Sequence, residues 1–127
     1  LIECQGKETL PLSSLYATEL DGLLQQYSCV YEVGGFAIDK NKIGDRYGGE
    51  SLNGARLLFK AVYEEAKRFG ADLLVVAVNP KHLSFYTLIG FQKFGEQKMY
   101  PFVDAPAVPL FLTMKGGAMA EDFFSRV

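Results

Sequence analysis

The 127-residue sequence predicts an α/β fold, and three features point to it. Residues 30–39 are rich in β-branched and aromatic side chains, as strands are. Residues 51–69 carry apolar side chains at helical spacing, and residues 73–78 form a wholly apolar run typical of a buried, parallel strand. A strand, a helix and a strand in succession make one βαβ unit. The length fits a single domain of ordinary size.

The amino-terminal part predicts one helix. It begins at Ser13 or Ser14, either of which can cap the first turn, and it ends near Gln26. Its apolar side chains recur at roughly helical spacing and comprise Leu15, Leu20, Leu23 and Leu24. We therefore expect an amphipathic helix ahead of the first long strand.

The clearest helix covers residues 51–69. Ser51 is its expected N-cap and Gly70 its expected stop. Glu64 and Arg68 lie one turn apart and are expected to pair. Its apolar stripe consists of Leu52, Ala55, Phe59, Val62, Ala66 and Phe69.

The carboxyl-terminal part predicts shorter elements. Asn79-Pro80 ends the buried strand, because proline cannot donate to a ladder. We expect a short helix at residues 81–88 that ends at Gly90, followed by strands at residues 91–96 and 108–114. Pro106 and Pro109 mark the start of the second strand. In the tail, residues 119–124 are either a short helix or disordered.

Composition excludes several classes of protein. A net charge of -2 lacks the basic excess typical of nucleic-acid binders. The longest aliphatic run, residues 73–78, is far shorter than the ~20 residues that a membrane-spanning helix needs. Cys4, Cys29 and the lone His82 lack the spacing of a zinc site, so we expect no metal. Free thiols suit the cytoplasm.

A glycine-rich loop precedes the central helix. Residues 45–51 run directly into the expected helix start, where backbone N–H groups and the helix dipole favour a phosphate group. Arg46, Gly48, Gly49 and Ser51 are therefore candidate phosphate-binding residues. An ordinary surface loop explains the same composition equally well.

Three further side chains can carry chemistry. Glu32 is an acid in an otherwise apolar strand, where desolvation would raise its pKa toward that of a general base. The alternative is a solvent-facing residue on an edge strand. Asn79 follows the buried strand, where α/β sheets bind ligands, although Asn-Pro is also a routine turn. Tyr86 can protonate a leaving thiolate or simply pack.

Together these residues resemble the GNAT-type N-acyltransferase superfamily. The loop from Arg46 to Ser51 is similar to its Gln/Arg-x-x-Gly-x-Gly/Ala pattern, although Ser replaces the last small residue and Asp45 stands where Gln is usual. A second motif, N…lY…GF, corresponds to Asn79, Phe85-Tyr86 and Ile89-Gly90-Phe91. The resemblance implies a mixed, twisted sheet with helices on both faces and two central parallel strands that splay apart.

A narrower resemblance links the chain to N-acyl amino acid synthases and acyl-homoserine-lactone synthases. Residues 31–39 are similar to the E-x-S-R-F-x-V-D strand of this branch, with Gly34-Gly35 in place of the Ser-Arg pair. The resemblance covers most of residues 8–114, and residues 77–108 are its most specific part. It implies transfer of a long-chain acyl group from acyl carrier protein to the amine of an amino acid.

The resemblance also implies a role for each candidate residue. Glu32 would take the proton of the attacking amine, and Tyr86 would protonate the departing sulfur. The strands that splay would end near Asp39 and Val78. The donor would be held by Asn79, by the backbone N–H groups of Phe36, Ala37 and Ile38, which would polarise the thioester carbonyl, and by the phosphate cradle of Arg46, Gly48, Gly49 and Ser51.

Two donors remain open. Acyl-coenzyme A and the acyl-phosphopantetheine arm of acyl carrier protein both carry a phosphate for the cradle. A basic rim of Lys40, Lys42, Arg46, Lys81 and Lys93 suits an acidic carrier protein as well as coenzyme A. Candidate lining for an acyl channel comprises Phe36, Phe91, Phe102 and Val108. Competing functions are an acetyl-coenzyme A dependent N-acetyltransferase and a catalytically silent ligand-binding module on the same fold.

The domain organisation follows from the same comparison. We expect residues 1–114 to form one acyltransferase domain that lacks its amino-terminal part, and residues 115–127 to form a tail. An edge strand exposed in this way would need cover from missing sequence or from a second copy of the chain, so a homodimer is a candidate assembly.

Overall fold

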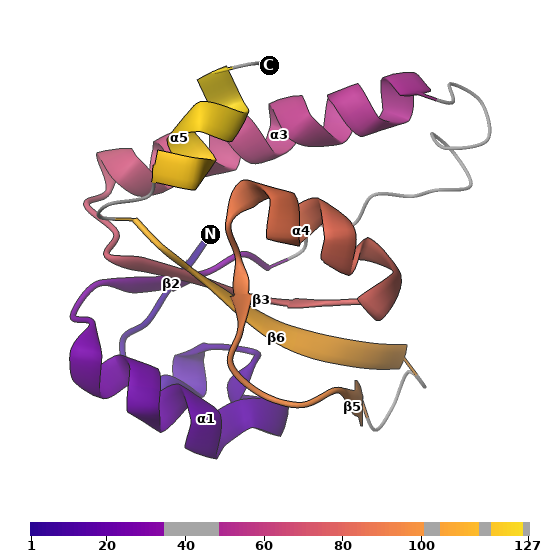
Figure 1. Ribbon diagram of the computed structural model, residues 1–127. Coiled ribbons are helices and arrows are strands. Elements are labelled where there is room, and N and C mark those ends of the chain that lie inside the picture. The colour runs from indigo at the N-terminus through magenta and orange to yellow at the C-terminus, as the bar shows by residue number, and fades with distance from the viewer. Residues whose placement is uncertain (35–48, 101–104, 115–117, 126–127) are drawn as a thin grey trace.

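Figure 1 shows the computed structural model, which describes residues 1–34, 49–100, 105–114 and 118–125, with side chains left undescribed at residues 49–55 and 118–119. The helices are α1 (Ser13–Gln26), α3 (Gly49–Arg68), α4 (Leu83–Ile89) and α5 (Ala118–Ser125), with 3₁₀ turns η1 (Lys7–Thr9) and η3 (Pro80–His82). The strands are β1 (Ile2–Glu3), β2 (Val30–Glu32), β3 (Leu73–Val78), β4 (Gln92–Lys93), β5 (Lys98–Tyr100) and β6 (Ala105–Thr113).

The strands form one mixed sheet. Their order is β1, β2, β3, β6, β4, and β5 pairs with β6 outside this path. β2 and β3 are parallel, with Glu32 beside Val75, as the βαβ pattern predicts. The other described pairs are antiparallel. β3 therefore lies at the centre of the sheet, with a neighbour on each edge.

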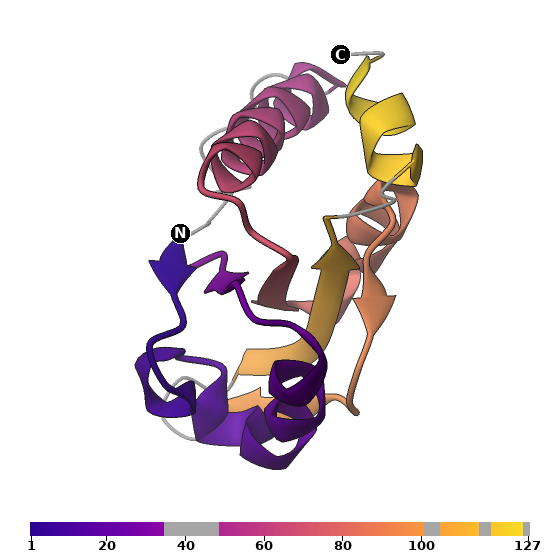
Figure 2. The ribbon, with the colours of Figure 1, turned by 90° about the vertical axis from the view of Figure 1, so that its left-hand side faces the viewer.

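Helices cover both faces of this sheet (Figures 1 and 2). Helix α1 covers one face and forms the α1 layer, whereas α3, α4 and α5 cover the other and form the α3–α5 layer. Side chains of β3 alternate between them: Leu73 and Val75 join the α1 layer, and Leu74 and Val76 join the α3–α5 layer. None of the four is more than 3% exposed, which explains the unbroken apolar run of this strand.

Tyr16 fastens α1 to the sheet. Its backbone departs from helical geometry (φ −123°, ψ 36°) and kinks α1. Its hydroxyl lies 2.8 Å from the carbonyl oxygens of both Glu96 and Ala107 and can donate to either. The ammonium of Lys98 lies 4.8 Å from the Tyr16 ring centroid and donates to the carbonyl of Leu15 at 2.9 Å. Polar contacts thus join the helix to β5 and β6 beside the apolar packing.

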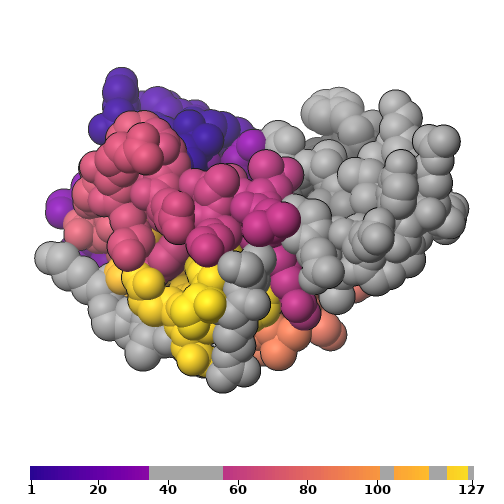
Figure 3. Space-filling model, turned by 90° about the horizontal axis from the view of Figure 1, so that it is seen from above, coloured from indigo at the N-terminus to yellow at the C-terminus, as the bar shows by residue number. Residues whose placement is uncertain are grey.

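Helices α3 and α5 lie side by side on the outer surface, as Figure 3 shows. The buried Phe124 packs against Phe59 and Tyr63, with ring centroids 6.3 and 5.0 Å apart. The Tyr63 hydroxyl and the Lys67 ammonium both donate to Glu121, at 3.1 and 2.7 Å. Of the two alternatives for residues 119–124, the short helix is therefore confirmed, because the apolar residues of α5 complete the core over α3.

Helix starts differ from the expected ones. The N-cap of α1 is Leu12, so Ser13 and Ser14 lie inside the helix, and the Ser14 hydroxyl donates to a preceding carbonyl instead of capping. Helix α3 begins at Gly49, two residues before the expected cap at Ser51. In both places the helical turn begins before the serine. The preference of serine for N-cap positions therefore did not predict the first residue of either helix.

The buried face of α3 also shifts from the expected stripe. Phe59 and Ala66 are fully buried as expected, and Tyr63, absent from the expected stripe, is buried with them. Phe69 is 51% exposed and stacks on Tyr31 with ring centroids 5.8 Å apart. Helix α3 therefore covers the sheet with its middle turns, and its last turn reaches the edge of β2.

The last turn of α3 is only partly as expected. Gly70 stops the helix with a positive φ of 75°, a conformation that suits glycine. The expected pair of Glu64 with Arg68 is wrong, since Arg68 lies 3.1 Å from Glu65 instead. Spacings of three and four both bring side chains together on a helix, so the sequence pattern did not distinguish them.

Strand β6 is longer than expected and contains both prolines. It starts at Ala105, so Pro106 and Pro109 lie within the strand, whereas they were expected to mark its start. Pro109 lies opposite Ala77 of β3, and its carbonyl accepts a hydrogen bond from the Phe94 N–H at 3.0 Å. In an antiparallel strand the N–H and C=O of one residue point to the same neighbouring strand, so position 109 faces Phe94 and not β3. The absence of an N–H at Pro109 therefore removes no hydrogen bond between β3 and β6.

The other strands are shorter than the patterns predict. The expected strand at residues 30–39 is described as β2 only for Val30–Glu32, and residues 35–39 lie outside the described residues. The expected strand at residues 91–96 is reduced to β4. The sequence patterns did not predict β1 and β5, because short edge strands form through distant partners and carry little pattern of their own.

Neighbouring residues of α3 provide a test of this packing. Replacing Phe59, which is fully buried against α4 and α5, with Ala should lower the free energy of unfolding by about 3–5 kcal/mol. Leu58→Ala should change it by less than about 0.5 kcal/mol, because Leu58 is 53% exposed. Urea denaturation of both variants measures the difference, and equal losses would contradict the assignment of the buried face.

Candidate active site

Glu32 is a buried acid on the α1 face of the sheet. Its side chain is 4% exposed, so the alternative of a solvent-facing residue on an edge strand is wrong. The Leu12 N–H, at the start of α1, donates to its Oε1 at 2.9 Å. Burial raises the pKa of the Glu32 carboxyl to about 7, although the hydrogen bond from Leu12 partly opposes this rise. A carboxyl group with this pKa can exchange a proton near neutral pH.

Tyr86 lies in the opposite layer. It is 5% exposed on α4, and its ring meets those of Phe59, Phe85 and Phe91 edge to face at 5.4–5.6 Å. Burial raises the pKa of the Tyr86 phenol to about 12. The Tyr86 ring is thus part of the packed core, and its hydroxyl keeps its proton throughout the physiological range.

Asn79 holds the turn that follows β3. Its side-chain Oδ1 accepts a hydrogen bond from the Lys81 N–H at 3.1 Å, and its backbone carbonyl accepts from the His82 N–H at 2.9 Å. These contacts cap η3 and direct the chain into α4, which carries Tyr86. Asn79 thus acts as the routine turn residue that its Asn-Pro context predicts, and it lies beside the end of β3.

The carboxyl ends of β2 and β3 form the edge of the sheet around which these residues lie. The last described hydrogen bond between the two strands runs from the Val33 N–H to the Val75 carbonyl, at 2.9 Å. Strand β3 continues to Val78, and over these last residues its partner among the described strands is β6. We call this end of the parallel pair the carboxyl edge. Ligands of α/β sheets bind at such edges.

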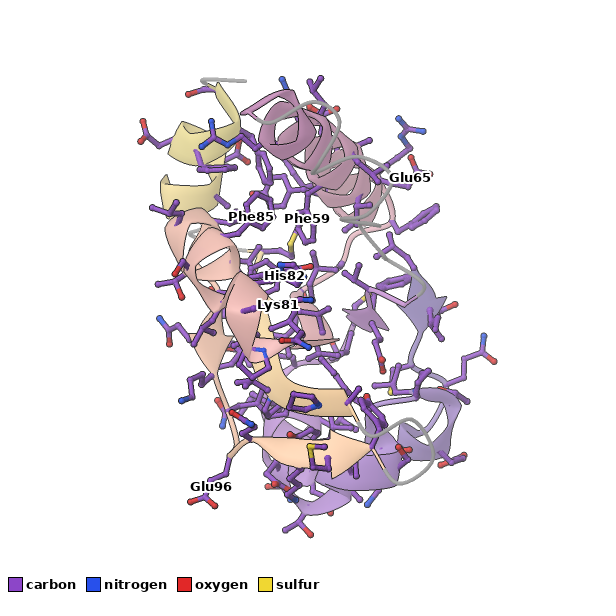
Figure 4. All side chains as sticks on the ribbon, turned by 90° about the vertical axis from the view of Figure 1, so that its right-hand side faces the viewer. Phe59, Glu65, Lys81, His82, Phe85 and Glu96 are labelled. Atoms are coloured by element: carbon purple, nitrogen blue, oxygen red, sulfur yellow. The ribbon has the colours of Figure 1, made fainter. Side chains whose placement is uncertain are left out.

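Glu32 and Tyr86 approach the sheet from opposite faces. Glu32 joins the α1 layer through Leu12, whereas Tyr86 belongs to the α3–α5 layer with Phe59 and Phe85. Figure 4 views this side of the molecule and shows Phe59 and Phe85 pointing toward one another above the turn that carries Lys81 and His82. An acid and a base on opposite faces can serve one reaction only if the reacting groups lie between the strands.

Several sequence candidates cannot be placed. Phe36, Ala37, Ile38, Arg46 and Gly48 lie outside the described residues, as do Lys40, Lys42 and Phe102. Gly49 and Ser51 lie in the first turn of α3. Of the channel candidates that are described, Phe91 and Val108 are each 3% exposed and belong to the core of the α3–α5 layer.

Gly34 has a structural role next to the candidate base. A Cβ atom at this position would lie 2.7 Å from Cδ1 of Ile2, so the side chain of β1 occupies the space that a larger residue at position 34 would need. At the first of the two departures from the Ser-Arg motif, glycine thus leaves room for the end of the Ile2 side chain, which would have to turn aside for a larger residue.

The family of the chain follows from two comparisons. The family model of the N-acyl amino acid synthase FeeM matches residues 2–113. The chain belongs to the FeeM family of N-acyl amino acid synthases. The solved structure of FeeM, an N-acyl amino acid synthase from uncultured soil microbes, is 34% identical, with a TM-score of 0.75. The match covers 88% of this chain and 58% of that one. No curated protein matches.

Membership of the FeeM family confirms the expected fold class. The six-stranded mixed sheet with helices on both faces agrees with the GNAT-like architecture that the sequence motifs implied. Within the described residues, no three His, Cys, Asp or Glu side chains gather as metal ligands do. None of the described helices is both long and apolar enough to cross a bilayer.

A cavity of this FeeM-family chain lies away from the candidate site. It has a volume of about 580 Å³ and opens at the other end of the parallel pair, near the start of β3. Its lining residues are Leu24, Gln25, Gln26, Tyr27, Ser28, Asp72 and Thr113. None of the sequence-predicted site residues lines it. This cavity therefore lies apart from the candidate residues, of which Glu32 has the most strongly altered environment on the α1 face.

The raised pKa of Glu32 predicts a specific pH dependence of stability. Between the ordinary value of 4.5 and the folded value of about 7, the folded protein keeps a proton that the unfolded chain has lost. Stability should therefore fall as the pH rises through this window, by about 3 kcal/mol in total. Denaturation of the wild type and Glu32→Gln from pH 4 to 8 measures the difference. A parallel decline in both proteins would contradict the assignment to Glu32.

Proposed function

We propose that the protein is an N-acyltransferase that moves an acyl group from a thioester to the primary amine of an amino acid. The observation that carries the proposal is the buried Glu32 carboxyl, whose pKa is about 7 and which lies at the carboxyl edge of the parallel pair. Membership of a family of N-acyl amino acid synthases supports the same reaction.

Glu32 supplies the base that this reaction requires. An amino acid carries its amine as an ammonium ion at neutral pH, and only the neutral amine attacks a carbonyl carbon. Glu32 accepts the proton as the new C–N bond forms, and burial makes it a stronger base than an exposed carboxylate. The hydrogen bond from Leu12 to Oε1 fixes the direction of the carboxylate and leaves Oε2 for the proton.

Tyr86 donates a proton to the leaving group in this proposal. The C–S bond breaks as the C–N bond forms, and the sulfur departs as a thiolate that needs a proton or a hydrogen bond. With a pKa of about 12, the Tyr86 phenol is fully protonated at neutral pH and so is available as the donor. Its place on the face opposite Glu32 suits a thioester that lies between the ends of β2 and β3, with amine and sulfur on different sides.

The donor is held by main-chain groups in this proposal. The N–H groups of Phe36, Ala37 and Ile38 continue the chain from β2 and would polarise the thioester carbonyl. The first turn of α3, with Gly49 and Ser51, offers unpaired backbone N–H groups and the positive end of a 20-residue helix to the donor phosphate. Arg46 and Gly48 would complete this cradle, and Asn79 fixes the turn at the end of β3.

Acyl carrier protein is the donor that we favour over coenzyme A. The resemblance of residues 77–108 to N-acyl amino acid synthases implies a long acyl chain. Exposed Lys81 and Lys93 offer positive charge to an acidic carrier on the α4 side of the sheet. An amino acid is the acceptor. A cytoplasmic location agrees with the free Cys4 and Cys29 thiols. We also propose that residues 1–114 act as one catalytic domain.

Product formation tests the proposal directly. The protein is incubated with long-chain acyl carrier protein, long-chain acyl-coenzyme A or acetyl-coenzyme A, each with a panel of amino acids, and N-acyl products are detected by mass spectrometry. Products formed from the carrier thioester support the assignment. Turnover of acetyl-coenzyme A alone would identify an N-acetyltransferase, and binding of a thioester without any product would identify a silent module.

The base is tested by an isosteric change. Glu32→Gln keeps the acceptor for the Leu12 N–H but cannot take a proton, so kcat/KM should fall by about 10²–10⁴-fold. The rise of kcat/KM with pH through about 7, expected for the wild type, should vanish in this variant. Glu3→Gln is the matched control, because Glu3 is an exposed glutamate on the neighbouring strand, and it should retain full activity.

The donor role of Tyr86 predicts a smaller effect. Tyr86→Phe keeps the aromatic packing and removes the hydroxyl, so kcat should fall by about 10–100-fold with the unfolding free energy nearly unchanged. Tyr27→Phe, at the far end of the parallel pair, is the control. A thioester with a more acidic thiol, which needs less help to leave, should recover most of the loss. Failure to recover it would point to a packing role only.

A further inference from the structure

The first turn of α1 has an attachment of its own to the sheet. Tyr16 departs from helical geometry and divides this turn from the rest of the helix, so the later turns do not fix its position. The Tyr16 side chain is fully buried, and its hydroxyl lies 2.8 Å from the carbonyl oxygen of Ala107 on β6 and 2.8 Å from that of Glu96. The side chain of Tyr16 therefore fastens the first turn to β6.

Hydrogen bonds run from this attachment to Glu32. The Tyr16 N–H donates to the Leu12 carbonyl at 2.9 Å, and the Leu12 N–H donates to Oε1 of Glu32, also at 2.9 Å. Leu12 is itself fully buried, so water does not replace either contact. Because β6 and β2 are the two neighbours of β3, this series of hydrogen bonds links the strands on either side of the central strand.

The surroundings of Glu32 make the contact with Leu12 important. The residues beside Glu32 on β1 and β3 are Ile2 and Val75, whose side chains are apolar. Within the part of the chain that the structure describes, the Leu12 N–H is the hydrogen-bond donor to the Glu32 side chain. A donor stabilises the charged carboxylate and so lowers its pKa, which opposes the rise caused by burial.

Other ionisable groups near the first turn of α1 come from β5 and from α1 itself. The ammonium of Lys98, on β5, donates to the Leu15 carbonyl at 2.9 Å and pairs with Glu19 of α1 at 3.1 Å, so these two charges offset each other. Tyr100 of β5 has a phenol pKa raised by burial and then by the charge of Glu32, and it is uncharged near neutral pH. The main-chain N–H at the start of α1 is therefore the contact that stabilises the carboxylate.

We propose that Tyr16 is a positioning residue for Glu32, because it holds the Leu12 N–H against the carboxylate. This role rests on the proposed function, in which Glu32 takes the proton of the attacking amine through Oε2. Without the Tyr16 hydroxyl, the first turn of α1 loses its attachment to β6 and the hydrogen bond to Oε1 weakens. The carboxylate then becomes less stable relative to the protonated acid, and a higher pH is needed to form the base.

A pH profile of activity tests the positioning role. Tyr16→Phe keeps the ring and removes the hydroxyl, so the rise of kcat/KM with pH should move upward by about 0.5–1 pH unit. Activity at pH 7 should fall by about 2–6-fold and return to within about twofold of the wild type at pH 9. Tyr63→Phe, the matched control, removes a similarly buried hydroxyl from the opposite layer and should leave the profile in place. An equal loss at every pH, or an unchanged profile, would overturn the proposal.

A double variant tests whether Tyr16 acts through the carboxylate. In the Glu32→Gln background, Tyr16→Phe should change the residual kcat/KM by less than about twofold, because the group that it positions can no longer take a proton. A further loss as large as the one in the wild-type background would show that Tyr16 acts on another part of the site and would overturn the positioning role.

A titration without substrate makes the test independent of turnover. In protein labelled with ¹³C at the glutamate side chains and with ¹⁵N, the Glu32 carboxyl resonance should titrate with a midpoint of about 7, and this midpoint should rise in Tyr16→Phe. If that variant does not fold, the wild-type amide resonances of Leu12 and Tyr16 decide, since both should follow the Glu32 midpoint. Amide resonances that stay constant would overturn the proposal. A raised midpoint in a protein that forms no product would overturn the transferase reaction and leave the positioning of Glu32 standing.

Discussion

The structure depends on one strand that is buried on both faces. Each side chain of β3 must leave water on one side or the other, so the sheet needs a layer of helices above and a layer below. That requirement gives α1 one face and α3, α4 and α5 the other. It also separates the two candidate groups, because Glu32 follows the α1 face of β2 and Tyr86 packs with the helices opposite. The two layers of the core thus hold one candidate group each.

Sequence patterns predicted the elements whose burial is local and periodic. The apolar run of β3, the spacing in α3 and the glycines that stop α3 and α4 are all strong signals within a few residues. The motif from Asn79 to Phe91 begins at the end of β3 and runs through α4 to the glycine that stops it, so the fold class and the position of Tyr86 could be stated before the structure. Glu32 was named from a different motif, which begins on β2.

What the sequence could not predict depends on contacts between distant residues. Strands β1 and β5 exist because β2 and β6 offer them partners. Pro109 is tolerated in a central strand because its missing N–H faces the Phe94 side, which no local rule reveals. The burial of Glu32 depends on a main-chain N–H twenty residues earlier, so the sequence left its environment open.

The contact between Ile2 and Gly34 has a consequence for how sequences of this kind can vary. Because the isoleucine end atom lies 2.7 Å from the place of a Cβ at position 34, the two positions are energetically coupled. A relative that carries Ser at position 34 must shift or shrink the residue at position 2. Because that atom is the free end of a flexible side chain, a rotation of Ile2 makes room, and substitutions at these two positions, far apart in sequence, are expected to influence one another.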